Sequence, residues 1–271
     1  MREGFNAKGP KSHNEAIRKV GARIYPMNTG FIRVDKGAYI TMGRGYGEEV
    51  DVPDWAFLVT DGEERILIDT GMCETGRADW HHPGSRQPGG YRIDERLGEL
   101  GVEPGDIDAV IFTHLHWDHC SNMKLFRNAK FYVHRRELEF ALDPHPLYLK
   151  SYESKRLGVT PPFEGADFEE VSGEYRLRPY ITIFPTPGHS PGHQSVAVET
   201  DEGLYVIAGD AVFSDENLEP DGHRGLPFTP MGRYVDVFDM FDSMERIFRM
   251  AKPDRIFPGH GRGVGRRPIY P

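Results

Sequence analysis

The sequence predicts a layered α/β fold, because short apolar runs typical of strands alternate with amphipathic segments typical of helices. The strand-like runs are residues 30–34, 56–60, 65–69, 109–112, 130–133, 180–184, 204–208 and 255–257. Helix signals occur at 93–100, 135–142 and 235–251. In the last of these, apolar side chains recur on one helical face, which indicates a buried stripe. Four strand-like runs also end at an imidazole or a carboxylate.

Length and composition indicate one globular domain over residues 1–271, with residues 1–22 as an N-terminal extension. No segment approaches the roughly 18 uninterrupted apolar residues of a membrane span. The polar residues 1–14 lack the apolar core of a secretory signal. The net charge of −9 argues against a nucleic-acid partner, which normally meets a basic face. We therefore expect a small-molecule substrate and neither a nucleic-acid nor a membrane partner.

The two cysteines, Cys73 and Cys120, are too few for a disulfide framework or a cysteine-based zinc site. This count fits a cytoplasmic protein. Cys120 directly follows a histidine and could be taken for a ligand or a nucleophile. Because free cysteine commonly behaves as a small hydrophobe, we expect it to be buried beneath the site instead.

The densest cluster of metal-ligand types is His114, His116, Asp118 and His119, directly behind the apolar run 109–112. Imidazole and carboxylate suit zinc and its first-row neighbours. A strand would place positions 114, 116 and 118 on one side, whereas a helix would separate them. A solvated polar loop would explain a single His-x-His pair, but four such groups together favour a metal site at the end of a strand.

Three further strand-like runs end at candidate ligands, which are His189, Asp210 and His260. Ligands in layered α/β proteins gather at the carboxyl ends of strands, so these groups are expected to converge. His193 competes with His189, but it precedes an apolar run and is expected to begin the next strand. Taken singly, Asp210 could be a turn residue. Together with the first cluster they supply seven ligands, enough for two ions that share a carboxylate.

Most of the other histidines have polar neighbours, and we expect them to be surface residues: His13, His81, His82, His145 and His223. His134 follows the strand-like run 130–133 and is as well explained by a structural role as by a functional one.

The ordered set His114-x-His116-x-Asp118-His119, His189, Asp210 and His260 resembles the metallo-β-lactamase superfamily. This resemblance implies an αββα sandwich with a dinuclear metal site at one edge of the sheets. By position, it implies that His114, His116 and His189 hold one ion. Asp118, His119 and His260 would hold the other ion, with Asp210 bridging. Asp69 is similar to the family's aspartate that orients a ligand imidazole from behind.

Within the superfamily the chain is most similar to the N-acyl homoserine lactonases, in residues 69–72, 186–195 and 216–219. Those lactonases typically carry a tyrosine three residues after the bridging aspartate, where its hydroxyl contacts the lactone carbonyl. Here Phe213 occupies this substrate-binding position and can donate no hydrogen bond. Another donor, or the metal alone, would have to polarise the carbonyl.

The resemblance implies a metal-dependent hydrolase that opens lactones, N-acyl homoserine lactones first, as in quorum quenching. Hydroxide held by two divalent metal ions would be the nucleophile; zinc is the default, and iron, manganese or cobalt would also fit. Asp118 is the candidate proton shuttle, with ligation alone as the other reading. The apolar residues Phe213, Leu226, Phe228, Met231, Tyr234 and Phe238 are candidates for an acyl pocket or for ordinary packing. A homodimer is expected from the resemblance. The alternative is another lactone, ester or thioester hydrolase of glyoxalase II type.

Overall fold

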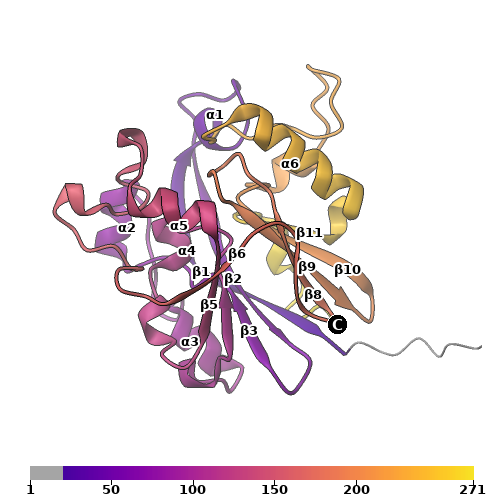
Figure 1. Ribbon diagram of the computed structural model, residues 1–271. Coiled ribbons are helices and arrows are strands. Elements are labelled where there is room, and N and C mark those ends of the chain that lie inside the picture. Colours follow the sequence, from indigo (N-terminus) through magenta and orange to yellow (C-terminus); the bar gives the residue numbers. More distant parts are fainter. Residues whose placement is uncertain (1–20) are drawn as a thin grey trace, which may run out of the picture.

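The computed structural model describes residues 21–271, and within them the chain forms two β-sheets that face each other between helical layers (Figure 1). The strands of the first sheet are β1 (Arg23–Asp35), β2 (Glu49–Thr60), β3 (Arg65–Ile68), β4 (Ala109–Ile111), β5 (Lys130–His134) and β6 (Phe168–Val171). Those of the second are β7 (Tyr175–Arg178), β8 (Ile181–Pro185), β9 (Gln194–Thr200), β10 (Gly203–Gly209) and β11 (Ile256–Pro258). The α-helices are α1 (Lys36–Tyr39), α2 (Thr75–His81), α3 (Ile93–Glu99), α4 (Trp117–Cys120), α5 (Arg135–Leu142) and α6 (Val237–Met250).

Strand direction is what brings the site residues to one edge. The first sheet has the order β1-β2-β3-β4-β5-β6, and β3 to β6 run parallel to one another. The second sheet has the order β11-β10-β9-β8-β7. There β10 is parallel to β11, and β8 has the same direction as β10 because each is antiparallel to β9. The carboxyl ends of β8, β10 and β11 therefore share an edge of the second sheet.

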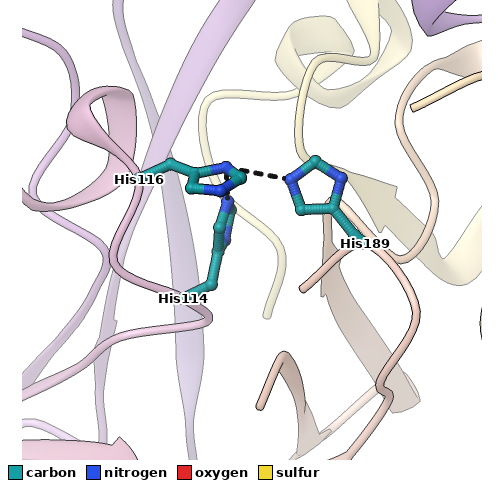
Figure 2. Close-up of side chains that lie close together, drawn as sticks. All are labelled: His114, His116 and His189. Carbon is teal, nitrogen blue, oxygen red and sulfur yellow. Dashed lines mark hydrogen bonds between the residues drawn. The ribbon is translucent and has the colours of Figure 1, made fainter. Parts of the chain in front are cut away.

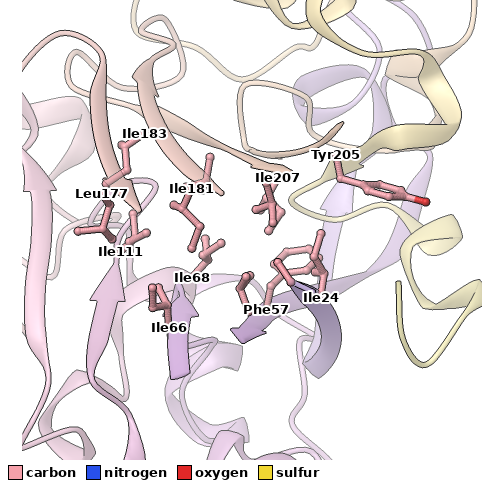
Figure 3. Packing of buried hydrophobic residues seen from close by; sticks show 14 of the residues in the cluster. Ile24, Phe57, Ile66, Ile68, Ile111, Leu177, Ile181, Ile183, Tyr205 and Ile207 are labelled. Carbon is pink, nitrogen blue, oxygen red and sulfur yellow. The ribbon is translucent and has the colours of Figure 1, made fainter. Parts of the chain in front are cut away.

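The two sheets enclose the main hydrophobic core (Figure 3). Ile66, Ile68 and Ile111 from the first sheet face Ile181 and Ile207 from the second, and all five side chains are fully buried. Fully burying such a side chain contributes about 1.5–3 kcal/mol. This core fixes the distance between the two sheets and therefore the distance between their loops.

Helices cover the outer faces, which completes the αββα sandwich predicted from the resemblance. Ile93 and Leu97 of α3 pack on the outer face of the first sheet with Val110. On the other side, Ile247 of α6 packs against Val206 of β10. None of the helices within residues 21–271 is both long and apolar enough to cross a membrane.

Most of the predicted elements are present, with changed boundaries. The last helix begins at Val237 because the Asp236 side chain accepts hydrogen bonds from the first free N–H groups of α6. Strand β1 is longer than the predicted run 30–34, since an irregularity between Asn28 and Gly30 lets it continue. The N-terminal extension lies almost entirely outside the described residues.

Candidate metal centre

All seven candidate ligands lie where a strand ends at one edge of the sandwich. Asp69 directly follows β3, and residues 114–119 follow β4, its parallel neighbour. From the second sheet, His189 follows β8, Asp210 follows β10 and His260 follows β11. The expectation that these strand ends converge matches the geometry described below.

One group of ligand atoms consists of His114, His116 and His189 (Figure 2). His116 Nδ1 lies 3.0 Å from His114 Nε2 and 3.1 Å from His189 Nε2. All three side chains are buried, and burial lowers the pKa of each imidazole. These histidines are therefore neutral, which is the state that binds a metal ion.

The second group consists of Asp118, His119 and His260, with Asp54 beside them. Asp118 Oδ2 is 3.8 Å from His119 Nε2 and 3.7 Å from His260 Nε2. Sequence analysis missed Asp54, which lies inside β2, is fully buried, and is 3.9 Å from His260 Nδ1. A charged residue within an apolar strand was the only signal that could have found it.

Asp210 joins the two groups through its two carboxylate oxygens. Oδ2 faces the first group, 3.3 Å from His189 Nε2 and 4.0 Å from His114 Nε2. Oδ1 faces the second group, 3.4 Å from His119 Nε2 and 3.2 Å from His260 Nε2. This is the arrangement that a carboxylate shared by two cations requires.

The donor set fits two metal ions on chemical grounds. His119 Nε2, His260 Nε2 and Asp210 Oδ1 are buried and have no hydrogen-bond partner. Leaving a buried polar atom unsatisfied costs about 1–3 kcal/mol, so each such atom calls for an explanation. Cations held among these atoms would supply the missing partner, and mixed imidazole and carboxylate ligands suit divalent first-row metals.

The outer nitrogens of His119 and His260 are held by the protein. His119 Nδ1 donates to Asp69 Oδ2 at 2.8 Å, and His260 Nδ1 donates to the Pro53 carbonyl at 2.9 Å. Asp69 is itself fixed by the N–H and the hydroxyl of Thr113, at 2.8 and 2.7 Å. Such partners set the tautomer so that Nε2 faces the metal site.

Burial and the neighbouring carboxylates act in opposite directions on the pKa values of His119 and His260. Burial disfavours a proton on His119 and on His260, but Asp210 and the neighbouring carboxylates outweigh it. The pKa of His119 is raised well above its usual range, and that of His260 is raised to about 9. The same pairing lowers the pKa of Asp210 despite its burial. The carboxylates thus favour positive charge at the positions that cations would take.

His193 lies outside both groups. Its Nε2 accepts a hydrogen bond from the Asp210 N–H at 3.0 Å, and its Nδ1 donates to Thr186 Oγ1 at 2.9 Å. Gly209 permits this approach, because a Cβ there would lie 2.9 Å from His193 Nε2 and the residue has φ +54°. His193 therefore positions the backbone of Asp210, while His189 supplies the nitrogen to the first group.

Glu137 of α5 ties the two ligand loops together, and sequence analysis missed it. Its buried carboxylate accepts hydrogen bonds from the Leu115 N–H at 3.0 Å and from the Tyr152 hydroxyl at 2.8 Å. It also accepts from the Ser190 hydroxyl at 2.5 Å and the Gly192 N–H at 3.3 Å. Leu115 lies between two histidines of the first loop, and Ser190 adjoins His189.

A narrow pocket leads to the metal centre. Its floor contains His116, His189, Asp118 and Asp210, and Phe213 forms part of its wall. The Phe213 ring lies 4.5 Å from that of His260 and 6.0 Å from that of Tyr39. The other apolar candidates do not line it. Phe228 and Met231 pack in the hydrophobic core instead, and Phe238 is 79% exposed.

Two histidines assigned to the surface are placed differently, and those expectations were wrong. His81 is buried: it stacks on Trp117 at 4.2 Å, and its Nε2 lies 2.9 Å from Glu153 Oε1. His82 lines the pocket, where burial lowers its pKa to about 4 and its Nε2 is 3.5 Å from the Tyr39 hydroxyl. His81 is the last residue of α2, and His82 directly follows it.

The other expectations concern the remaining histidines and Cys120. His145 and His223 are exposed, as expected, and His13 lies outside the described residues. His134 has a structural role, because its Nδ1 accepts from the Arg136 N–H at the start of α5. Cys120 is fully buried beneath the site, also as expected, and burial raises the pKa of its thiol well above its usual range.

Comparison with known proteins defines the class of protein. Residues 51–260 match the metallo-beta-lactamase superfamily, and the chain belongs to this superfamily. It is 30% identical over 226 residues to an N-acyl homoserine lactonase of Bacillus thuringiensis, an alignment that covers 79% of this chain and 83% of that protein. It is also 30% identical over 254 residues to the N-acyl homoserine lactonase AttM of Azorhizobium caulinodans, covering 88% and 92% of the two chains.

Solved structures agree with these sequence relatives. One is an N-acyl homoserine lactone hydrolase with the product N-hexanoyl-L-homoserine bound at its catalytic metal center. It has a TM-score of 0.73 to this chain at 26% identity, over 91% of this chain and 96% of that one. The predictions of the superfamily, of the αββα fold and of a metal-dependent hydrolase are confirmed.

Proposed function

We propose that this protein opens the ester bond of lactones, with N-acyl homoserine lactones as the leading substrates. The observation that carries the proposal is the pair of ligand groups that share Asp210 at the floor of a pocket. The relatives named as N-acyl homoserine lactonases support the substrate assignment.

The chain's own residues would hold two cations. His114, His116 and His189 would bind one of them, and Asp118, His119 and His260 the other, with Asp210 between the two. Bound divalent ions would lower the pKa of water and polarise a carbonyl group. Zinc is the metal we propose, because it favours imidazole and carboxylate ligands.

Asp118 is the residue we assign to proton transfer. Its side chain lines the pocket and is 12% exposed, so its carboxylate is accessible to substrate. Water adds to the lactone carbonyl, the ring C–O bond breaks, and the departing oxygen takes up the proton that the water has lost. Asp118 carries this proton from the attacking water to the leaving oxygen. The product is the ring-opened hydroxy acid.

The donor that replaces the missing tyrosine hydroxyl is expected from the pocket residues near Phe213. The Tyr39 hydroxyl and the neutral His82 imidazole both belong to the pocket lining, 3.5 Å apart. A donor placed where negative charge develops stabilises the transition state.

We further propose that the protein acts on small molecules in the cytoplasm as a homodimer, without a nucleic-acid or membrane partner. The two cysteines are free and buried, which fits a reducing compartment. The net charge of −9 disfavours binding to nucleic acid. The similarity to the lactonases is the basis for the homodimer.

A turnover panel on zinc-loaded protein tests this proposal. The substrates are N-hexanoyl-homoserine lactone, γ-butyrolactone, δ-valerolactone, S-lactoylglutathione and a bis-aryl phosphodiester. We expect the lactones to have the highest kcat/KM values, and we expect Asp210→Asn to abolish turnover together with metal content. Strong cleavage of the phosphodiester or the thioester, with the lactones inert, would contradict the lactonase assignment.

A further inference from the structure

An arginine lies in the pocket without an ion-pair partner among residues 21–271. Arg233 lines the pocket together with His116, His189 and Asp210. Within residues 21–271 its guanidinium is hydrogen-bonded to a neutral group, the Ser151 hydroxyl, at 3.3 Å, and it forms no ion pair. Part of its donor capacity is therefore open to a ligand, since a guanidinium carries five N–H donors.

Other partly buried arginines of this chain pair with a carboxylate, for example Arg77 with Glu153 and Arg178 with Glu64. Within residues 21–271, Arg255 has no ion pair and packs on an aromatic ring, as Arg233 does. A partly desolvated cation gains from an anionic partner, and Arg233 differs from Arg255 in that it lines the pocket of the metal centre.

Aromatic rings hold the guanidinium in place. Its carbon lies 4.7 Å from the Tyr148 ring centroid and 5.8 Å from that of Tyr39. The Tyr148 hydroxyl donates to the Tyr234 carbonyl at 2.7 Å, which fixes that ring. Cation–π contacts stabilise the charge without consuming its in-plane N–H donors. The group is thus oriented, with its edge available.

The position of Arg233 is tied to the metal centre. Its carbonyl accepts a hydrogen bond from His189 Nδ1 at 3.2 Å, so the same residue orients a ligand imidazole. After burial, which is the larger effect, the positive charge of Arg233 helps to lower the pKa of His116 and of His189. The guanidinium of Arg233 therefore lies beside the first ligand group, which is His114, His116 and His189.

We propose that Arg233 binds a carboxylate of the substrate, so that lactones bearing a carboxylate near the scissile carbonyl are preferred over neutral lactones of the same size. This inference rests on the proposed lactonase function and adds a preference among lactones of equal size. A guanidinium binds a carboxylate through two parallel N–H···O bonds, with more energy and specificity than a neutral acceptor provides.

Two isosteric lactones test the proposal: 5-oxotetrahydrofuran-2-carboxylate and its primary amide, which is neutral. We expect the kcat/KM of the metal-loaded wild type to be about 10–100-fold higher for the acid, as one charge-assisted pair would give. Arg233→Gln should remove most of this preference, mainly through KM, and Arg233→Lys should restore part of it. The preference should persist in Arg127→Gln, which loses the same charge at an exposed position. Equal kcat/KM values in the wild type, or an unchanged ratio in Arg233→Gln, would overturn the proposal.

A binding measurement separates this inference from the lactonase assignment. Glutarate, which has no ester bond, is titrated calorimetrically into metal-loaded wild type and Arg233→Gln, with metal content measured in both. We expect at least tenfold weaker binding to the variant, whether or not either lactone is opened. Equal affinities would overturn the role of Arg233. Inert lactones with Arg233-dependent glutarate binding would contradict only the lactonase function.

Discussion

Replacing Asp69 by asparagine tests how the protein presents His119 to a metal ion. Asp69 Oδ1 accepts from the Thr113 N–H, and Oδ2 accepts from the Thr113 hydroxyl and from His119 Nδ1. An asparagine side chain has only one acceptor oxygen. The Thr113 N–H, which is fixed by the backbone, donates its hydrogen bond to this oxygen. The amide NH₂ then faces His119 Nδ1, which must become an acceptor. His119 Nε2 would carry the proton and lose the lone pair that binds the metal.

The size of this effect follows from the bond that is lost. A hydrogen bond to a charged group contributes about 1.5–3 kcal/mol, which corresponds to about 10–100-fold in affinity. Loss of a partner that orients a metal ligand typically weakens metal binding by the same factor of about 10–100. We therefore expect Asp69→Asn to bind one of its two ions about 10–100-fold more weakly than the wild type.

Competition titration against a metal chelator measures this affinity, and ¹⁵N NMR of the imidazoles reports the tautomer. Asp108→Asn is the matched control, since it makes the same substitution at an exposed residue whose Oδ2 accepts from the Arg65 N–H. Wild-type affinity at both sites in Asp69→Asn, with His119 Nε2 still unprotonated, would refute the reasoning.

Three other perturbations have defined outcomes. Phe213→Tyr places a hydroxyl on the pocket wall, and steady-state kinetics should show a rise of about tenfold in lactone kcat; no gain would mean that carbonyl polarisation is already supplied. Metal binding at pH 7 should release about two protons, from His119 and His260, because a ligand imidazole must be neutral. Calorimetry in buffers of different ionisation enthalpy measures the number of protons released. This number should fall as the pH rises through about 9, the raised pKa of His260; a number that does not change with pH would contradict this. Glu137→Gln places an NH₂ against two of the four donors and should cost roughly 3 kcal/mol, or roughly 6–12 °C in Tm; an unchanged Tm would show that these bonds contribute little.

The convergence of the candidate ligands could be predicted because each of them lies shortly after an apolar strand-like run. The order of these residues along the chain resembles that of the metallo-β-lactamase superfamily, so residues far apart in the chain could be assigned to one site. Choosing His189 over His193 was harder, since both stand beside Pro-Gly turns. Only the geometry shows that His193 Nε2 accepts a hydrogen bond from the Asp210 N–H and is therefore not available to a metal ion.

The residues that support and surround the ligands could not be predicted, because they converge only through tertiary folding. Asp54 comes from the middle of β2, Glu137 from α5, and Arg233 from the loop before α6. Strands β6 and β7 were also missed, because they are edge strands of only four residues, two of which are charged in each strand. His82 was misjudged for the related reason that a polar neighbourhood in sequence does not determine burial.

The metal content of the chain tests the central claim most directly. Inductively coupled plasma mass spectrometry of protein purified from metal-replete medium should find two divalent ions per wild-type chain. Asp210→Asn, which removes the only carboxylate that faces both groups within residues 21–271, should retain fewer than two and lose lactone turnover. A wild-type chain that holds no metal while it hydrolyses lactones at full rate would contradict the account.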